Sequence, residues 1–325
     1  MRILVLGGTR FLGRHIVERL ALCGHRVVCF HRGQTRAALP AGVEERYGDR
    51  NAGLDAIVGE PWDAVVDTCC YRPEQMRATL KLRTDRYLLI STANVYADLS
   101  HPHLAETAPT IETFDLNDDA ASYGGNKAAC ERLLVQSRIG KALVFRAGLI
   151  AGTWDPTGRF TYWCRRLLRG GSVLAPGDSG RPIQYIDAAD LAAFAEHALA
   201  ADLEGAFNVV GPASRTSMAE LLDACASVAA GRAAPPATIV WVNEELLLQQ
   251  GVEEWSELPL WLTDPNFAGI LQLDNSRALN AGLTPRPTVD TVRAVLDWLA
   301  RDGDAAPAGM LPEREAELLR LTTVG

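Results

Sequence analysis

Hydrophobic residues in the first half of the chain gather in short runs that alternate with amphipathic stretches. The aliphatic run at residues 3–6 is typical of a strand buried on both faces of a parallel sheet. A glycine turn and a helix over about residues 12–21 follow it, and further strands are predicted at 26–30, 64–67 and 87–91. This alternation predicts an α/β fold, a doubly wound parallel sheet of the Rossmann type, with its ligand at the carboxyl ends of the strands.

The pattern changes after residue 150, where Pro and Gly become frequent and favour loops and short elements. We expect residues 1–150 to form the Rossmann domain, with 183–212 and 285–302 returning to it. Residues 151–182 and 213–284 are expected to form a smaller C-terminal substrate-binding domain, with a helix at 218–228 and a strand at 238–242. Residues 303–325 are expected to hold a linker, at 303–309, and a last amphipathic helix at 313–321.

Composition narrows the possible partners of this chain of 325 residues. It carries 32 Lys and Arg against 40 Asp and Glu, a net charge of −8, which disfavours binding to nucleic acid or to an anionic membrane. The seven cysteines include no CxxC pair, and the His-Pro-His at 101–103 has no third ligand, so no metal is expected. No signal peptide and no apolar run of about 18 residues is present, which predicts a soluble, cytoplasmic protein.

A glycine-rich turn at residues 7–13, Gly-Gly-Thr-Arg-Phe-Leu-Gly, lies between the first strand and the first helix. Gly7 permits a tight turn, and Gly13 lets the helix pack closely on the strand. The free backbone N–H groups at the start of the helix can face a pyrophosphate, so the turn predicts a dinucleotide site. The candidate cofactor contacts are Gly7, Thr9, Arg10, Phe11, Leu12, Gly13, Arg32, Asp49, Thr68 and Cys69.

The end of the second predicted strand favours one dinucleotide over the other. An NAD site usually places an acidic residue here, next to the ribose 2′-hydroxyl, whereas this chain has Phe30-His31-Arg32-Gly33. Arg32, together with Arg10 in the glycine turn, would suit the additional phosphate of NADP. We therefore expect NADP(H) in preference to NAD(H); the alternative is that both arginines are solvent-facing loop residues.

The sequence Tyr123-Gly-Gly-Asn-Lys127 places a phenol and an ammonium four residues apart, on one face of a helix. A nearby ammonium lowers the pKa of a phenol and makes it useful as a general acid and base. Thr92 ends a buried strand upstream, from where its hydroxyl can donate to a substrate oxygen beside Tyr123. Taken alone, the Tyr and Lys pair is also compatible with an exposed helix.

Together these motifs resemble an extended-type member of the short-chain dehydrogenase/reductase superfamily, in the NAD-dependent epimerase/dehydratase group. The resemblance includes the glycine turn, residues 91–96 and 123–127, Phe145-Arg146, and the segments 184–187 and 190–192. It implies that Tyr123 is the acid and base, that Thr92 orients the substrate oxygen, and that Lys127 also holds the nicotinamide ribose. It also implies contacts of Tyr123 and Lys127 with the cofactor, and makes a homodimer the candidate assembly.

Departures from the family pattern disfavour some of the reactions and substrates that are known in the family. Leu6 and Arg10 replace the Thr and the middle Gly of the usual loop, which resembles an atypical subgroup with a Gly-Gly-x-x-x-x-Gly loop. Ala93 and Asn94 stand where dehydrating and decarboxylating relatives carry acidic residues. Ile183 stands where epimerases usually have an Arg for a nucleotide diphosphate, which disfavours a nucleotide sugar.

These observations favour an NAD(P)-dependent oxidoreductase that transfers hydride at a secondary alcohol or ketone of a small polar substrate, such as a sugar, a cyclitol or a natural-product intermediate. The first alternative is a sugar epimerase that retains its NAD, and the second is a non-catalytic relative that binds a nucleotide or RNA. The candidate substrate contacts, for which a place on the outer surface is an equal expectation, are Asn94, Asp155, Arg159, Tyr162 and Arg181.

Overall fold

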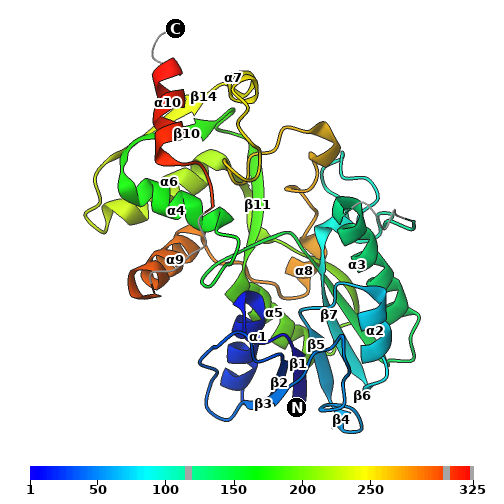
Figure 1. Cartoon of the computed structure of the whole chain (residues 1–325). Coiled ribbons are helices and arrows are strands. Elements are labelled where there is room, and N and C mark those ends of the chain that lie inside the picture. Colours follow the sequence, from blue (N-terminus) through cyan, green and yellow to red (C-terminus); the bar gives the residue numbers. More distant parts are fainter. Residues whose placement is uncertain (114–118, 303–307, 323–325) are drawn as a thin grey trace.

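The computed structural model describes residues 1–113, 119–302 and 308–322. Its main feature is a parallel sheet of seven strands in the order β12-β8-β7-β5-β1-β2-β3, drawn in the lower half of Figure 1. The strands are β1 (Arg2–Leu6), β2 (Arg26–His31), β3 (Glu44–Tyr47), β5 (Ala64–Asp67), β7 (Arg86–Thr92), β8 (Lys141–Ala147) and β12 (Gly205–Val209). The strand order reverses between β1 and β5, and in doubly wound sheets ligands bind at such a reversal.

Helices cover both faces of this sheet because successive strand residues point to opposite sides. Ile3 and Val5 pack in one core with α1 (Phe11–Leu22) and α5 (Ala188–Ala200). Leu4 and Leu6 pack in another core with α2 (Pro73–Thr79) and α3 (Asp119–Val135). The continuous aliphatic runs of the sequence are therefore strands buried on both faces, and the predicted doubly wound α/β fold is confirmed.

Most of the remaining elements form a second, smaller part in the upper half of Figure 1, and its own hydrophobic core is the second core. It contains the parallel pair β10 (Gly171–Pro176) and β14 (Ala237–Val242) and the three-stranded sheet of β9 (Leu149–Ala151), β11 (Pro182–Asp187) and β13 (Gly211–Ser217). Its helices include α4 (Arg159–Arg169), α6 (Met218–Ala230), α7 (Glu244–Gln249), α9 (Thr288–Asp302) and α10 (Pro312–Thr322).

Short elements complete the chain. The pair β4 (Pro61–Trp62) and β6 (Arg83–Thr84) forms a separate two-stranded sheet. The 3-10 helix η1 (Ala93–Val95) directly follows β7. The elements η2 (Pro265–Phe267) and α8 (Ser276–Asn280) lie between α7 and α9 in the chain. The predicted helices at 12–21, 218–228 and 313–321 and the strand at 238–242 correspond to α1, α6, α10 and β14.

Two segments pack in other cores than the expected boundaries suggest. Residues 285–302 were expected to return to the Rossmann domain, but Val292, Val295 and Leu296 of α9 belong to the second core. Conversely, Ala278 and Leu283 of the segment 213–284 pack in the sheet core. The apolar face of a helix packs against whichever surface is nearest in space, which the composition of the segment does not reveal. Most of the predicted linker, residues 303–307, lies outside the described residues.

Candidate functional site

A cavity of about 570 Å³ opens at the carboxyl ends of β1, β2, β5 and β7. The sheet brings these ends to one edge, so residues far apart in the sequence line the same space. Every predicted cofactor contact and every predicted catalytic residue lines it: Gly7, Thr9, Arg10, Phe11, Leu12, Gly13, Arg32, Asp49, Thr68, Cys69, Thr92, Tyr123 and Lys127.

The glycine turn passes so close to its surroundings that side chains would not fit. Gly7 has φ +89°, and a Cβ there would lie 2.7 Å from the Thr68 hydroxyl oxygen. A Cβ on Gly13 would lie 2.1 Å from the Gly7 carbonyl oxygen, so only glycine lets α1 approach the turn this closely. Arg10, the residue that caps α1, makes no side-chain hydrogen bond to the first turn of the helix. The first N–H groups of α1 therefore lie at the cavity edge without a side-chain cap, as an anion site requires.

The end of β2 has a fixed geometry. His31 is buried, its Nε2 lies 2.9 Å from Glu45 Oε2, and its Nδ1 accepts a hydrogen bond of 3.1 Å from the Gly33 N–H. A nitrogen that accepts carries no proton, so this geometry makes Nε2 the donor to Glu45. The ring thereby holds the turn that presents the exposed Arg32 to the cavity. Among the described residues that line the cavity, Asp49 is the only acidic one.

Thr92 and Tyr123 meet at the other end of the cavity. Thr92 ends β7, and its hydroxyl accepts a hydrogen bond of 3.3 Å from the Asn94 N–H. Burial raises the pKa of Tyr123 above its ordinary value, while a hydrogen bond from Thr92 acts in the opposite direction. The two side chains approach each other because Gly124 lies against η1: a Cβ there would be 2.2 Å from the Asn94 carbonyl oxygen.

Lys127 is buried one turn further along α3. Its Nζ donates to the carbonyl oxygens of Cys70, at 2.9 Å, and Ile90, at 2.5 Å. Burial lowers the pKa of Lys127. Burial gives the pKa of Tyr123 the opposite direction from the lowering that was expected from the nearby ammonium.

The five predicted substrate contacts are not among the residues that line this cavity. Asp155 is buried, burial raises its pKa, and it accepts hydrogen bonds from Thr157. The guanidinium of Arg159 lies 5.3 Å from the ring centre of Trp255. Asn94 adjoins the cavity through its hydrogen bond to Thr92, and its side chain is not part of the lining.

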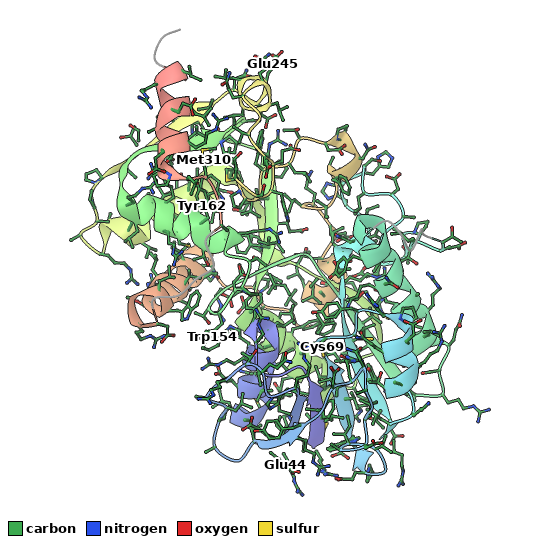
Figure 2. The ribbon with its side chains drawn as sticks, viewed as in Figure 1. Glu44, Cys69, Trp154, Tyr162, Glu245 and Met310 are labelled. Carbon is green, nitrogen blue, oxygen red and sulfur yellow. The ribbon has the colours of Figure 1, made fainter. Side chains whose placement is uncertain are left out.

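Tyr162 and Arg181 are engaged in the second part of the structure. Tyr162 is buried in the second core, and Figure 2 shows it in the upper half of the molecule, near Met310 and away from Cys69. Arg181 forms an ion pair with Glu244 and donates to the Leu262 carbonyl oxygen at 2.8 Å. The substrate assignments of all five residues stay predictions without support from the cavity.

Sequence reasoning did not single out three cavity residues of chemical interest. Arg50 follows Asp49 directly, Tyr71 lies in the turn after β5, and His31 ends β2. The positions of Arg50 and Tyr71, each close behind a strand of the sheet, are the signal that could have found them.

Two negative findings apply to the described residues only. No group of three or more His, Cys, Asp or Glu side chains there is arranged to hold a metal ion. In the same part of the chain, no helix combines the length and the apolar character needed to cross a membrane.

Comparison with protein families gives a match to the family described as "NAD dependent epimerase/dehydratase family", over residues 3–69 and 74–210. Among curated proteins, 2′-dehydrokanamycin reductase of Streptomyces kanamyceticus is 28% identical over 46% of this chain and 43% of its own length. A chloroplast stem-loop binding protein of 41 kDa from Arabidopsis thaliana is 28% identical over 33% of each chain. The chain thus matches less than half the length of either curated relative.

Solved structures give a fold match over nearly the whole chain. A UDP-glucose 4-epimerase is similar over 94% of this chain and 100% of its own, with a TM-score of 0.69 and 19% identity. The enzyme WbmG of Bordetella bronchiseptica, solved with NAD and UDP, is similar over 95% and 99%, with a TM-score of 0.66 and 19% identity. At this identity the likeness concerns the fold alone.

Proposed function

Because the chain belongs to the NAD dependent epimerase/dehydratase family, we propose that it is an NADP(H)-dependent oxidoreductase of the short-chain dehydrogenase/reductase type. Its reaction would interconvert a secondary alcohol and a ketone on a small polar molecule, such as a sugar, a cyclitol or a natural-product intermediate. The main support for the proposal is that the glycine turn lines the same cavity as Thr92, Tyr123 and Lys127. The reductase among the curated relatives supports the same class of reaction.

The residues of the cavity fit a dinucleotide. Gly7 and Gly13 let the turn and α1 approach so closely that any Cβ would clash, and the first turn of α1 beside them is uncapped. Asp49 follows β3, and Lys127 of α3 contacts Ile90 of β7. The strands β3 and β7 lie on opposite sides of β1. With a dinucleotide at this turn, Asp49 and its neighbours would hold the adenosine end, and Lys127 would hold the nicotinamide end.

When bound, the nicotinamide would supply or accept the hydride. Tyr123 would donate its phenol proton to the substrate oxygen during reduction and recover it during oxidation. A phenol is protonated at neutral pH, and burial raises the pKa of Tyr123 further, which suits the donation of a proton. Thr92, hydrogen-bonded to Tyr123, would hold the substrate oxygen in place, and the buried Lys127 would orient the nicotinamide ribose from its two carbonyl contacts.

The preference for NADP(H) is supported by the charges near the end of β2. Arg10 of the glycine turn and Arg32 after β2 both line the cavity, and His31 occupies the strand end where an NAD site usually has an acidic residue. His31 is held by Glu45 and Gly33, so it cannot take over the acceptor role toward a 2′-hydroxyl.

An epimerase that retains NAD is the second candidate, because the matched family is described as one of NAD dependent epimerases and dehydratases. Such an enzyme would oxidise and re-reduce one carbon without net consumption of cofactor. The net charge of −8 argues against extending the stem-loop binding of the plant relative to this chain.

The test is a fluorescence titration of cofactor-stripped protein with NADPH and NADH, followed by a panel of carbonyl substrates. We expect tighter, reversible binding of NADPH, its oxidation by at least one substrate, and a shift toward NADH in the Arg32→Asp variant. Arg36→Asp is the matched control, since Arg36 is exposed in the same loop and does not line the cavity. Protein that retains NAD through stripping and consumes no NADPH would favour the epimerase and contradict the proposal.

A further inference from the structure

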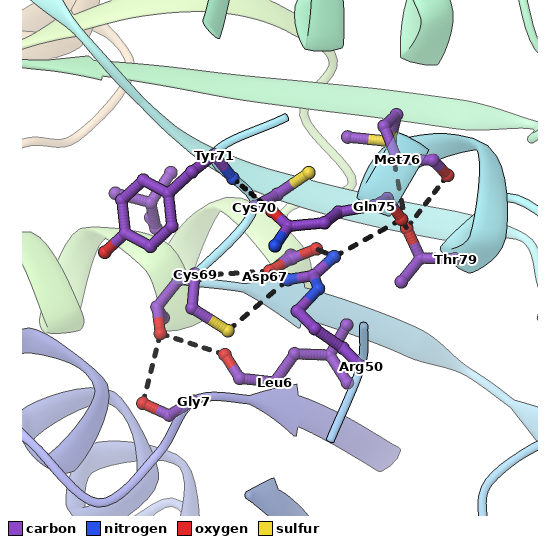
Figure 3. Close-up of polar contacts among 12 residues, drawn as sticks. Leu6, Gly7, Arg50, Asp67, Cys69, Cys70, Tyr71, Gln75, Met76 and Thr79 are labelled. Atoms are coloured by element: carbon purple, nitrogen blue, oxygen red, sulfur yellow. Dashed lines mark hydrogen bonds and ion pairs between the residues drawn. The ribbon is translucent and has the colours of Figure 1, made fainter. Parts of the chain in front are cut away.

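Arg50 and Asp67 form a buried ion pair beside the cavity (Figure 3). The guanidinium donates to both carboxylate oxygens, at 2.7 and 2.9 Å, and the two side chains are 8% and 0% exposed. Asp67 also accepts from the Tyr87 hydroxyl at 2.6 Å and from the Cys69 N–H at 3.1 Å. Burial alone would raise the pKa of Asp67, but Arg50 and these hydrogen bonds hold it below its ordinary value. The pair is therefore ionised in the folded protein.

A second set of contacts joins the segment that carries Arg50 to the segment that carries Asp67. The Gln75 amide donates to Asn51 Oδ1 at 2.8 Å, and its Oε1 accepts from the Tyr71 N–H at 2.7 Å. The Arg50 guanidinium also reaches the Gln75 carbonyl oxygen, at 3.4 Å. The turn after β3 and the segment from Asp67 to Gln75 are thus joined at both ends.

The segment that begins at Asp67 also contacts the glycine turn and Lys127. Its Thr68 hydroxyl donates to the carbonyl oxygens of Leu6, at 2.9 Å, and Gly7, at 3.1 Å, which fixes it against the glycine turn. Two residues later, the Cys70 carbonyl accepts from Lys127 Nζ. One short segment therefore contacts the glycine turn, the ion pair and the proposed nicotinamide end of the cavity.

One donor of Arg50 is left over. Its Nε is buried and has no hydrogen-bond acceptor among the described residues, while Arg50 itself lines the cavity. A buried, unsatisfied N–H of a charged group is costly, and a ligand atom can provide the missing acceptor.

We propose that Arg50 is a positioning residue that couples the adenosine end of the bound dinucleotide to Lys127. Its Nε–H donates to an acceptor atom of the adenosine part, and its ion pair with Asp67 holds the segment whose Cys70 carbonyl orients the Lys127 ammonium. The inference rests on the proposed function only in that a dinucleotide fills the cavity. Binding of the adenosine end then fixes residues 67–70, and these residues orient Lys127 at the nicotinamide end.

The first experiment compares Arg50→Lys with Arg46→Lys. Lysine keeps a positive charge beside Asp67 but lacks both the two-pronged geometry and Nε. Arg46 is paired with Glu44 and Glu60 outside the cavity lining, which makes it a matched control. We expect Arg50→Lys to weaken NADPH binding about ten-fold, since hydrogen bonds to a charged group are lost. We also expect altered nicotinamide emission at saturating NADPH, whereas Arg46→Lys changes neither.

A merely structural role for Arg50 would lower the unfolding temperature and leave the affinity and emission of the folded fraction unchanged, which would overturn the inference. A weaker affinity with normal nicotinamide emission would overturn it as well, because the two ends would then be independent. If the wild-type protein binds neither dinucleotide, the proposed function fails together with the inference. Wild-type binding beside an unaffected Arg50→Lys variant overturns the inference alone.

A second experiment uses the wild-type chain, so it does not depend on the folding of a variant. Adenosine 2′,5′-bisphosphate carries the adenosine end of NADP and has no nicotinamide. Hydrogen exchange is measured with and without this compound. We expect slower exchange of the backbone amide of Cys70, which does not line the cavity, as well as of the amides at the glycine turn. Protection confined to the glycine turn and the end of β2 would overturn the coupling.

Discussion

Gly13→Ala tests whether the close approach of α1 to the glycine turn creates the dinucleotide site. In the structure, the new Cβ would lie 2.1 Å from the Gly7 carbonyl oxygen, 3.0 Å from the Gly7 carbonyl carbon and 3.1 Å from the Gly8 Cα. All three are backbone atoms, so no rotation of a side chain relieves the clash. Ordinary contact begins at 3.4 Å, so the turn and the helix must separate by about 1.3 Å along this direction.

Two opposing effects set the magnitude. Alanine is favoured over glycine inside a helix by up to about 1 kcal/mol, while overpacking costs about 1–3 kcal/mol. We therefore expect a modest net loss of stability, near 1 kcal/mol. Binding is expected to suffer more, because a shift of this size moves the turn out of hydrogen-bond range of a pyrophosphate. A charge-assisted hydrogen bond contributes about 1.5–3 kcal/mol, so its loss corresponds to roughly ten-fold to a hundred-fold weaker binding.

The assay is NADPH titration by fluorescence, combined with thermal unfolding of the same samples. Gly231→Ala serves as the control, since Gly231 already has a helical φ of −62° and a Cβ there would meet no atom closer than 3.5 Å. The control is expected to bind NADPH like the wild type. A Gly13→Ala variant that folds and binds NADPH with wild-type affinity would refute the argument that this contact shapes the site.

Three further results are expected. Tyr123→Phe should reduce turnover by about 10²–10⁴-fold and leave the Kd for NADPH nearly unchanged, by steady-state kinetics and titration; retained turnover would remove Tyr123 from its role. Reduction needs the protonated phenol, so kcat/KM for reduction should fall as pH rises through the raised pKa of Tyr123, and a rise instead would contradict this assignment. Arg166→Met should destabilise the protein by about 3 kcal/mol in urea unfolding, because it leaves the buried Glu315 with Arg169 as its remaining cation. Loss of the exposed Arg293 should cost under about 1 kcal/mol, and equal effects of the two substitutions would refute the role of burial.

Elements whose signal is local could be predicted from the sequence. The strands predicted at 3–6, 26–30, 64–67 and 87–91 appear as apolar runs because both of their faces are covered, and α1 begins directly after the glycine turn. The edge strand β3, Glu-Glu-Arg-Tyr, has no such run and was not predicted. The carboxyl ends of parallel strands share one edge, so the motifs at residues 7–13, 92 and 123–127 were expected to meet there, and they line one cavity.

The substrate contacts could not be predicted in the same way. Tyr162 and Arg181 have the chemistry of binding residues, yet one lies in the second core and the other is paired with Glu244. Which surface a loop or helix of the second part faces depends on long-range packing, and its residue types do not determine that. The same reason moved α9 from the expected Rossmann domain to the second core.

The sequence by itself thus determined the α/β alternation, the glycine turn and the identity of Thr92, Tyr123 and Lys127. Only the tertiary structure decided how these groups are charged and held. Lys127 is bound by the carbonyl oxygens of Cys70 and Ile90, which lie 57 and 37 residues away in the chain. Spacing along one helix predicted proximity of ammonium and phenol, but the pKa of Tyr123 follows from its burial. Burial and long-range hydrogen bonds depend on the packing of several segments at once, whereas periodicity and turn chemistry act within a few residues.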